Sequence, residues 1–210
     1  MKYLGKPAGM WALFAGSFEK HLTVEFDLTA GQAKDVAARA KKKYREIIAK
    51  LPEFDKRDRF EMNIVNCAML TAFILCMPQR PDIKTLTDYC AAAMMTPTMK
   101  AFCRASGKKK FTPKDIEGMK ATAKLRAGDR NPYSWNMDFF EYEDGSGYVA
   151  RFTTCGICTL MQVLGLYDLT PALCHLDYTM SDAGGASDFV REYTLASGGP
   201  YCDCGYHKKQ

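Results

Sequence analysis

A change in sequence pattern near residue 131 is the strongest constraint on the fold of this 210-residue chain. Before it, apolar residues recur at the three- and four-residue spacing of helices. After it, short aromatic and β-branched runs alternate with turn residues. Asn131-Pro132 marks the change, because proline disfavours the helical conformation in the residue before it. We expect a helical half over residues 1–130 and an α+β half over residues 131–210, packed as a single domain.

Helix-start signals divide the first half. Thr29 and Gln32 fit a capping box, in which each side chain binds a free backbone N–H at the helix start. Thr112-Pro113 places a hydroxyl cap before a proline at the first helical position. Together with the apolar spacing, these signals predict helices over residues 30–51, 60–76, 82–103 and 113–128.

The second half predicts two β-hairpins separated by two short helices. The strand-like runs are residues 135–143 and 148–154, then 188–196 and 201–206, each pair joined by turn residues. The helices are expected over residues 158–164 and 170–181. The fold class is therefore α+β, with a helical N-terminal half packed against a small antiparallel sheet of two hairpins and their intervening helices.

Composition indicates which cellular compartment and which kinds of binding partner to expect. Nine cysteines, an odd number with no secretory leader before them, favour reduced thiols in the cytoplasm over a disulfide framework. The net charge is +5, but the lysine runs lack the interleaved aromatic residues or reader motif of a nucleic-acid-binding protein. The apolar stretch over residues 64–77 is shorter than the about 20 residues of a membrane span. We expect a small-molecule substrate, no nucleic acid and no membrane.

Two motifs in the second half carry candidate chemistry on helices. Cys155 ends a strand-like run and enters a predicted helix, whose free backbone N–H groups and dipole lower the pKa of a thiol. On the next helix, Cys174 and Asp177 share a face at spacing i, i+3. An aspartate beside an apolar stripe needs a partner, and a ligand is one candidate.

Two further motifs lie on the strand-like runs. In Cys202-Asp203-Cys204, a regular strand directs the two thiols to one side and Asp203 to the other. Arg151 and Arg191 suit a carboxylate, which a guanidinium binds through two parallel hydrogen bonds. Ordinary surface or cross-strand charges are the alternative explanation of these arginines.

The cysteine spacing also allows other interpretations. Cys155-x-x-Cys158 and Cys202-x-Cys204 would supply four thiolates to a zinc ion, although the second pair lacks the usual zinc spacing. A redox dithiol at Cys155 and Cys158 is a further alternative, but such motifs usually lie within a βαβ pattern, which is not predicted here. We expect no metal and no cofactor.

These motifs resemble the L-2-amino-thiazoline-4-carboxylic acid hydrolase family over about residues 135–206. The family signature pairs an early Cys-Pro-Leu with a later Cys-x-x-Asp and a closing Gly-x-x-Cys-Asp. The matching residues are Cys155-Gly156-Ile157, Leu164-Gly165-Leu166, Leu169-Thr170-Pro171, Leu173-Cys174-His175-Leu176-Asp177, Arg191, Thr194-Leu195-Ala196, Gly198-Gly199 and Cys202-Asp203. Spacing matches Cys155, rather than Cys158, to the early cysteine. Gly156 stands where proline is usual.

The resemblance implies a hydrolase that opens a cyclic isothiourea carrying a carboxylate, such as L-2-amino-thiazoline-4-carboxylate, to a carbamoyl-cysteine. In this scheme Cys155 attacks the ring carbon C2. Asp177, or as second choice Asp203, steadies the cationic ring and assists proton transfer. The substrate-binding residues would be Cys174, Cys202, Arg151 and Arg191.

The closing hairpin also resembles that of vinyl-reductase-type ligand-binding domains, which end in a Gly-x-x-Cys pattern. This weaker similarity implies a non-catalytic, sensor-like domain that binds a small molecule without converting it. A zinc protein should contain bound metal, a sensor should bind a ligand unchanged, and an enzyme should have a rapidly alkylated thiol that a substrate-like molecule protects. The sequence gives no indication of the oligomeric state.

Overall fold

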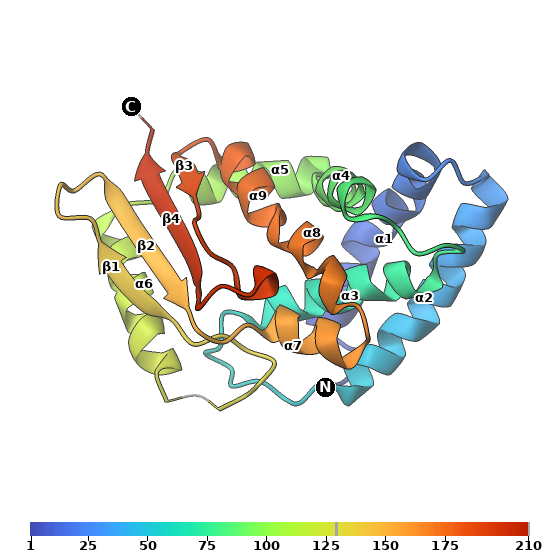
Figure 1. The fold of residues 1–210 in the computed structure, drawn as a ribbon, viewed down its shortest axis with the longest axis horizontal. Coiled ribbons are helices and arrows are strands. Elements are labelled where there is room, and N and C mark those ends of the chain that lie inside the picture. Colours follow the sequence, from blue (N-terminus) through green and yellow to red (C-terminus); the bar gives the residue numbers. More distant parts are fainter. Residues whose placement is uncertain (129, 210) are drawn as a thin grey trace.

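The computed structural model of the chain describes residues 1–128 and 130–209 (Figure 1). In chain order its elements are α1 (Lys6–Glu25), α2 (Ala30–Lys50), α3 (Glu61–Cys76), α4 (Ile83–Met94), α5 (Pro97–Gly107), α6 (Pro113–Arg126), β1 (Asp138–Glu141), β2 (Gly147–Phe152), α7 (Gly156–Val163), the 3₁₀ turn η1 (Tyr167–Leu169), α8 (Thr170–Cys174), α9 (Leu176–Gly184), β3 (Ser187–Val190), the 3₁₀ turn η2 (Leu195–Ser197) and β4 (Cys202–Lys208). The fold is α+β with a helical N-terminal half, which confirms the sequence-based prediction.

Helix α3 lies at the centre of the helical half. It packs against α1, α2 and α7, and Ile64, Met69 and Phe73 are fully buried. The Phe73 ring stacks on Trp11 of α1, with the ring centroids 5.5 Å apart. A helix that is apolar on all sides is typical of a protein core. No helix in the described residues is long and apolar enough to cross a membrane.

Two predicted helices are interrupted. Residues 170–181 lie in two helices, α8 and α9, which meet at His175. Residues 82–103 form two helices, α4 and α5, because Thr96 and Pro97 start a new helix between them. Thr96 caps α5 by accepting a hydrogen bond from the backbone N–H of Met99 at 3.2 Å. Pro97 has no N–H to continue α4 and suits the first position of the next helix. The capping box at Thr29 and Gln32 is confirmed.

The two predicted hairpins form one antiparallel sheet with strand order β1-β2-β4-β3. Strands β2 and β4 are central, with Ala150 opposite Cys204 and Phe152 opposite Cys202. Because successive side chains of a strand point to opposite faces, these four side chains share one face. That face is turned towards the helices.

Strand β3 is shorter than the sequence predicts. It ends at Val190, and the chain then runs irregularly to the turn η2 instead of continuing as a strand to residue 196. The cause is the Asp203 carboxylate, which accepts hydrogen bonds from the backbone N–H groups of Glu192 at 2.9 Å and Tyr193 at 2.6 Å. These N–H groups are therefore taken out of the strand ladder.

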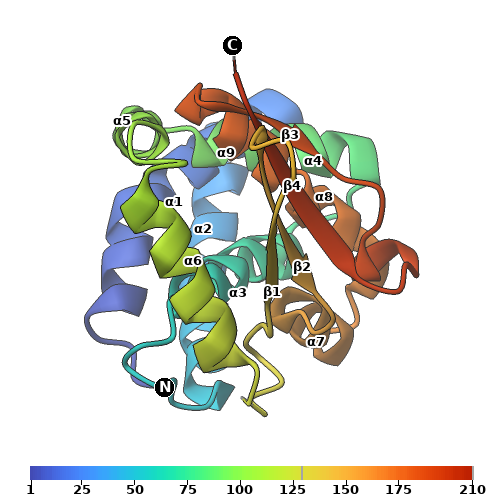
Figure 2. The same cartoon turned by 90° about the vertical axis from the view of Figure 1, so that its left-hand side faces the viewer.

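Helices α7 to α9 fill the space between the sheet and the helical half. In Figure 1 the sheet lies at the left, α1 and α2 lie at the right, and α3, α7, α8 and α9 lie between them. Helix α9 packs on α5 and β3, and α8 packs on α4. Helix α6 runs beside β1 (Figure 2). One cluster of buried apolar residues extends from Met10 in α1 to Leu176 in α9, so the two halves share a core.

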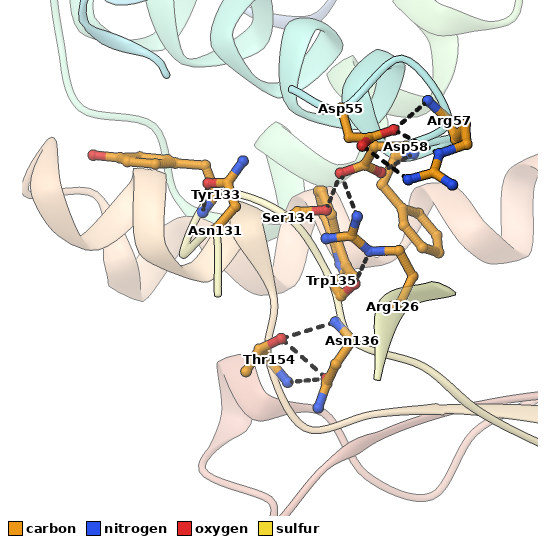
Figure 3. Close-up of polar contacts among 11 residues, drawn as sticks. Asp55, Arg57, Asp58, Arg126, Asn131, Tyr133, Ser134, Trp135, Asn136 and Thr154 are labelled. Carbon is orange, nitrogen blue, oxygen red and sulfur yellow. Dashed lines mark hydrogen bonds and ion pairs between the residues drawn. The ribbon is translucent and has the colours of Figure 1, made fainter. Parts of the chain in front are cut away.

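A buried ion pair joins the segment before α3 to the end of α6. Arg126 Nη1 lies 3.1 Å from Asp58 Oδ2, and the two side chains are 2% and 1% exposed. The Ser134 hydroxyl donates to the same carboxylate oxygen at 2.6 Å, and Arg126 Nε donates to the Trp135 carbonyl at 3.0 Å (Figure 3). The segment before α3 is thereby held beside the end of α6 and the residues that follow it.

Arg126→Ala should destabilise the fold strongly, because it leaves the Asp58 carboxylate buried without its counter-charge. Removing one partner of a buried pair typically costs about 3–5 kcal/mol. We expect a loss of this size in the free energy of unfolding, measured by urea denaturation. Arg57→Ala is the matched control, since its ion pair with Asp55 is exposed and should contribute little. Equal losses for the two variants would contradict this role of Arg126.

Candidate functional site

A cavity of about 280 Å³, here called the thiol cavity, lies between α3, the start of α7, helices α8 and α9, and the inner face of the sheet. Apolar side chains form most of its wall, including Leu70, Trp135, Met137, Phe152 and Leu173. Polar groups are few and lie mainly on α3, α9 and the segment after β3. Such a wall, apolar with a few directed polar groups, is typical of a small-molecule site.

Five cysteines among the described residues line the thiol cavity, and they are Cys67, Cys155, Cys174, Cys202 and Cys204. The alternation along β4 brings Cys202 and Cys204 to the cavity, as the sequence predicts. Cys67 is the one that the sequence pattern does not single out. A cysteine within an apolar helix is usually a packed core residue, so no local signal distinguishes it.

Cys155 occupies the N-cap position of α7, shortly after β2. Hydrogen bonds to its sulfur lower the pKa of this thiol against the opposing effect of burial. The strongest comes from the Cys158 thiol, and others come from the backbone N–H groups of Cys158 and Ile157 and from the Trp135 side chain. Donors that stabilise the charged form at a helix N-terminus are the usual cause of a reactive thiolate.

The other cavity thiols differ from Cys155. Burial raises the pKa of Cys67, Cys174, Cys202 and Cys204, to about 12 for Cys204. The pKa of Cys158 is also raised, first because its thiol donates to the Cys155 sulfur and then because of burial. Cys155 is therefore the thiol of this group that ionises at the lowest pH.

Gly156 lets the start of α7 lie close to the segment that carries Trp135. A Cβ atom at Gly156 would lie 2.1 Å from the Tyr133 carbonyl oxygen and 3.0 Å from the Trp135 ring. Proline, which the resemblance leads one to expect here, also carries a Cβ and would meet the same oxygen. The contact between Trp135 and Cys155 therefore depends on glycine at this position.

Arg191, directly after β3, binds three groups at the edge of the thiol cavity. Its guanidinium donates to the Asp177 carboxylate, to the Cys174 carbonyl at 3.1 Å and to the Cys204 sulfur at 3.0 Å. The Arg191 side chain is 6% exposed, whereas that of Asp177 is 45% exposed. Arg191 thus holds Asp177 at the cavity wall. The Nε of Arg191 is buried and has no hydrogen-bond acceptor among the described residues.

Asp203 and Arg151 do not line the thiol cavity. They lie opposite each other in the pairing of β2 with β4, on the outer face of the sheet. The Asp203 carboxylate binds the backbone after β3, as described above, and the Arg151 guanidinium stacks 4.3 Å above the centroid of the Tyr201 ring. The candidate residues that the fold brings together are thus Cys155, Asp177, Cys174, Cys202 and Arg191.

Helix α3 contributes two amide side chains that the sequence interpretation missed. Asn63 and Asn66 lie one turn apart and both line the thiol cavity. Asn66 Oδ1 is buried and has no hydrogen-bond donor among the described residues. A buried acceptor without a donor is unfavourable, so we expect water or a ligand to supply one. The sequence signal that could have identified these residues is a pair of amides at spacing i, i+3 in an otherwise apolar helix.

The thiols do not gather into a metal site. Among residues 1–128 and 130–209, no three His, Cys, Asp or Glu side chains are arranged to hold a metal ion together. Cys155 and Cys158 form a hydrogen-bonded pair at the start of α7. The four-thiolate arrangement that the spacing allows is therefore not assembled in the described residues.

Iodoacetamide should alkylate Cys155 at a lower pH than the other cavity thiols. The thiolate is the reactive form, and a lowered pKa preserves it as the pH falls below about 8.5, the usual value for cysteine. Peptide mass spectrometry from about pH 5 to about pH 9 would give the rate for each cysteine. Cys158→Ala should shift the Cys155 profile to higher pH, and Cys76→Ala, outside the cavity, should not. Faster alkylation of Cys174 at low pH would contradict this assignment.

Comparison with known proteins identifies the family of the chain. The family model for L-2-amino-thiazoline-4-carboxylic acid hydrolases matches residues 63–206. The match begins within α3, extends into β4 and includes all five cysteines of the thiol cavity. No curated protein and no solved structure matches the chain. Since the family match covers more than half of the sequence, the chain belongs to the L-2-amino-thiazoline-4-carboxylic acid hydrolase family.

Proposed function

We propose that this protein hydrolyses a small cyclic amidine, such as L-2-amino-thiazoline-4-carboxylate, to a carbamoyl-cysteine, with Cys155 as the nucleophile. The observation that carries the proposal is a thiol of lowered pKa at a helix N-terminus, facing a cavity of small-molecule size. Membership of a hydrolase family supports the reaction class. A cysteine activated by helix N–H groups is an established kind of nucleophile.

In the first step the Cys155 thiolate adds to the ring carbon C2, which carries the ring sulfur and two nitrogens. The bond between C2 and the ring sulfur then breaks, and the sulfur leaves with the electron pair and takes up a proton from solvent. The ring is now open, and C2 is joined to the Cys155 sulfur as an isothiourea. A covalent intermediate of this kind divides one difficult hydrolysis into two easier steps.

In the second step water adds to C2. The bond between C2 and the Cys155 sulfur breaks, and the electron pair returns to the thiolate. One proton of the attacking water moves to the imine nitrogen of C2, the other passes through Asp177 to solvent and balances the proton that the ring sulfur took up, and the oxygen remains as the carbonyl of the carbamoyl group. The product is the substrate plus one water, and the enzyme regains its thiolate.

Asp177 is the carboxylate proposed to steady the cationic ring and to accept protons from water. Arg191 occupies its Oδ2 oxygen, which supports a fixed orientation with Oδ1 directed to the substrate. The unpaired Oδ1 of Asn66 is a suitable acceptor for the exocyclic amino group. Cys174 and Cys202 line the pocket in this scheme, and Arg191 acts on the substrate through Asp177.

Incubation of the pure protein with L-2-amino-thiazoline-4-carboxylate should yield a product one water heavier by mass spectrometry. Cys155→Ala should reduce turnover to the uncatalysed rate, and Cys76→Ala should retain it. Turnover by the Cys155→Ala variant would support the hydrolase activity and contradict the thiol mechanism. Binding of the compound without any turnover by the wild type would reject the enzyme and favour the sensor-like alternative.

Asp177→Asn should lower kcat by about 10²- to 10⁴-fold, the range for a general acid–base group. Asp203→Asn is the comparison, because Asp203 lies on the outer face of the sheet and its carboxylate accepts hydrogen bonds from two backbone N–H groups. It should retain kcat while lowering the melting temperature. Loss of kcat in Asp203→Asn with normal turnover in Asp177→Asn would reverse the two assignments.

A further inference from the structure

A second cavity of about 280 Å³ adjoins the thiol cavity, and no proposed step uses it. The residues that line both cavities are Arg59, Met119, Asp177, Met180 and Tyr206. Beyond them the second cavity extends between α5, α9 and the far end of the central strands. Its wall includes the loop residue Lys110 and the hydroxyl groups of Ser106, Ser181 and Ser187.

Lys110 is a partly buried cation on which the carboxylates of Asp115 and Asp177 act only at a distance. Its Nζ lies 3.2 Å from the centroid of the Tyr206 ring, and no carboxylate among the described residues forms an ion pair with it. Asp115 is engaged elsewhere, because its Oδ2 accepts from the Phe111 backbone N–H at 2.9 Å and from the Tyr148 hydroxyl at 3.2 Å. Burial lowers the pKa of Lys110 to about 8.

The charged groups of the two adjoining cavities balance in number once the proposed Cys155 thiolate is included, but they are not paired one to one. Their cationic side chains are Arg59, Lys110 and Arg191, and their carboxylates are Asp115 and Asp177. Asp177 is paired with Arg191. A cation that is partly removed from water is unfavourable unless an opposite charge accompanies it. An anionic group on a ligand would supply that charge at Lys110.

Strand β4 sets the separation between the thiolate and Lys110. At one end of the strand Cys202 lines the thiol cavity together with Cys155, and at the other end Tyr206 contacts Lys110. Four residues of a strand span about 13 Å at 3.3 Å per residue. A five-membered ring with its own carboxylate is shorter than this. A ring followed by two extended residues, each about 3.4 Å long, covers the distance.

We propose that the substrate is a cyclic amidine extended by a short chain ending in a carboxylate, which binds Lys110 in the second cavity. The inference about the ring end of this substrate depends on the proposed function. The inference about the carboxylate end depends on the second cavity alone. The charges then alternate along the site. The cationic ring meets the Cys155 thiolate and Asp177, and the distal carboxylate meets Lys110.

Two matched compounds test this proposal. L-2-amino-thiazoline-4-carboxylate would be coupled through its carboxyl group to glycylglycine, or to glycylglycinamide, which has the same length but a neutral end. Calorimetry on the Cys155→Ala variant would give the Kd of each without turnover. We expect the acid to bind about 10- to 100-fold more tightly than the amide. Adding Lys110→Met should remove this difference, and adding Lys109→Met, on an exposed neighbour, should not.

Acetylation of lysines gives a readout that requires neither turnover nor substitution of Lys110. An amine with a pKa of about 8 is about half neutral at that pH and reacts with acetic anhydride. At ten times its Kd the glycylglycine compound should slow acetylation of Lys110 by about tenfold. Acetylation of Lys109 should not change, and the amide should protect neither lysine. Peptide mass spectrometry would measure each site.

Equal Kd values for the acid and the amide would overturn the carboxylate subsite. Tight binding of the acid without any change in the acetylation of Lys110 would overturn it too. Failure of both compounds to bind would overturn it as well. Protection of Lys110 by the acid, together with no hydrolysis of any ring compound by the wild type, would retain the subsite and reject the proposed function. The two proposals can therefore fail separately.

Discussion

The buried ion pair between Arg126 and Asp58 is the constraint on which the site depends. It joins the segment before α3, the end of α6 and the segment that enters the sheet, and its cost in desolvation is offset by the hydrogen bonds around it. The same arginine holds the carbonyl of Trp135, whose side chain donates to the Cys155 sulfur. The pKa of the candidate nucleophile is thereby linked to a charge pair in the core.

The thiol cavity lies where the helical half meets the sheet, and neither half forms it alone. Helix α3 supplies Asn66 and Cys67, and the α+β half supplies Cys155, Asp177 and Arg191. Burial raises the pKa of most of these thiols, so the hydrogen bonds from the Cys158 thiol and from the N–H groups of α7 determine which one ionises. The ion pair of Arg191 with Asp177 compensates the charge of a carboxylate at the wall of the cavity that Cys155 also lines.

Local sequence signals predicted most elements, because each depends on residues close together in the chain. The capping box at Thr29 follows from one hydroxyl and one amide three residues apart. The placement of Cys155 at a helix start follows from the turn before it, and the shared face of Cys202 and Cys204 follows from the pleat of a strand. Thr96-Pro97 is a local signal for the break before α5. The apolar spacing on both sides favoured one continuous helix instead.

The chain's periodicity alone therefore determined the α+β class, most helices after α1 and the alternation of side chains along β4. Only the tertiary structure decided which face of that strand meets the helices, and so brought Cys204 inward and left Asp203 and Arg151 outside. The tertiary structure also decided the pairing of Arg126 with Asp58 and the partial burial of Lys110. The reason is that alternation distinguishes two faces of a strand, whereas burial and charge pairing depend on which distant segments pack against each face.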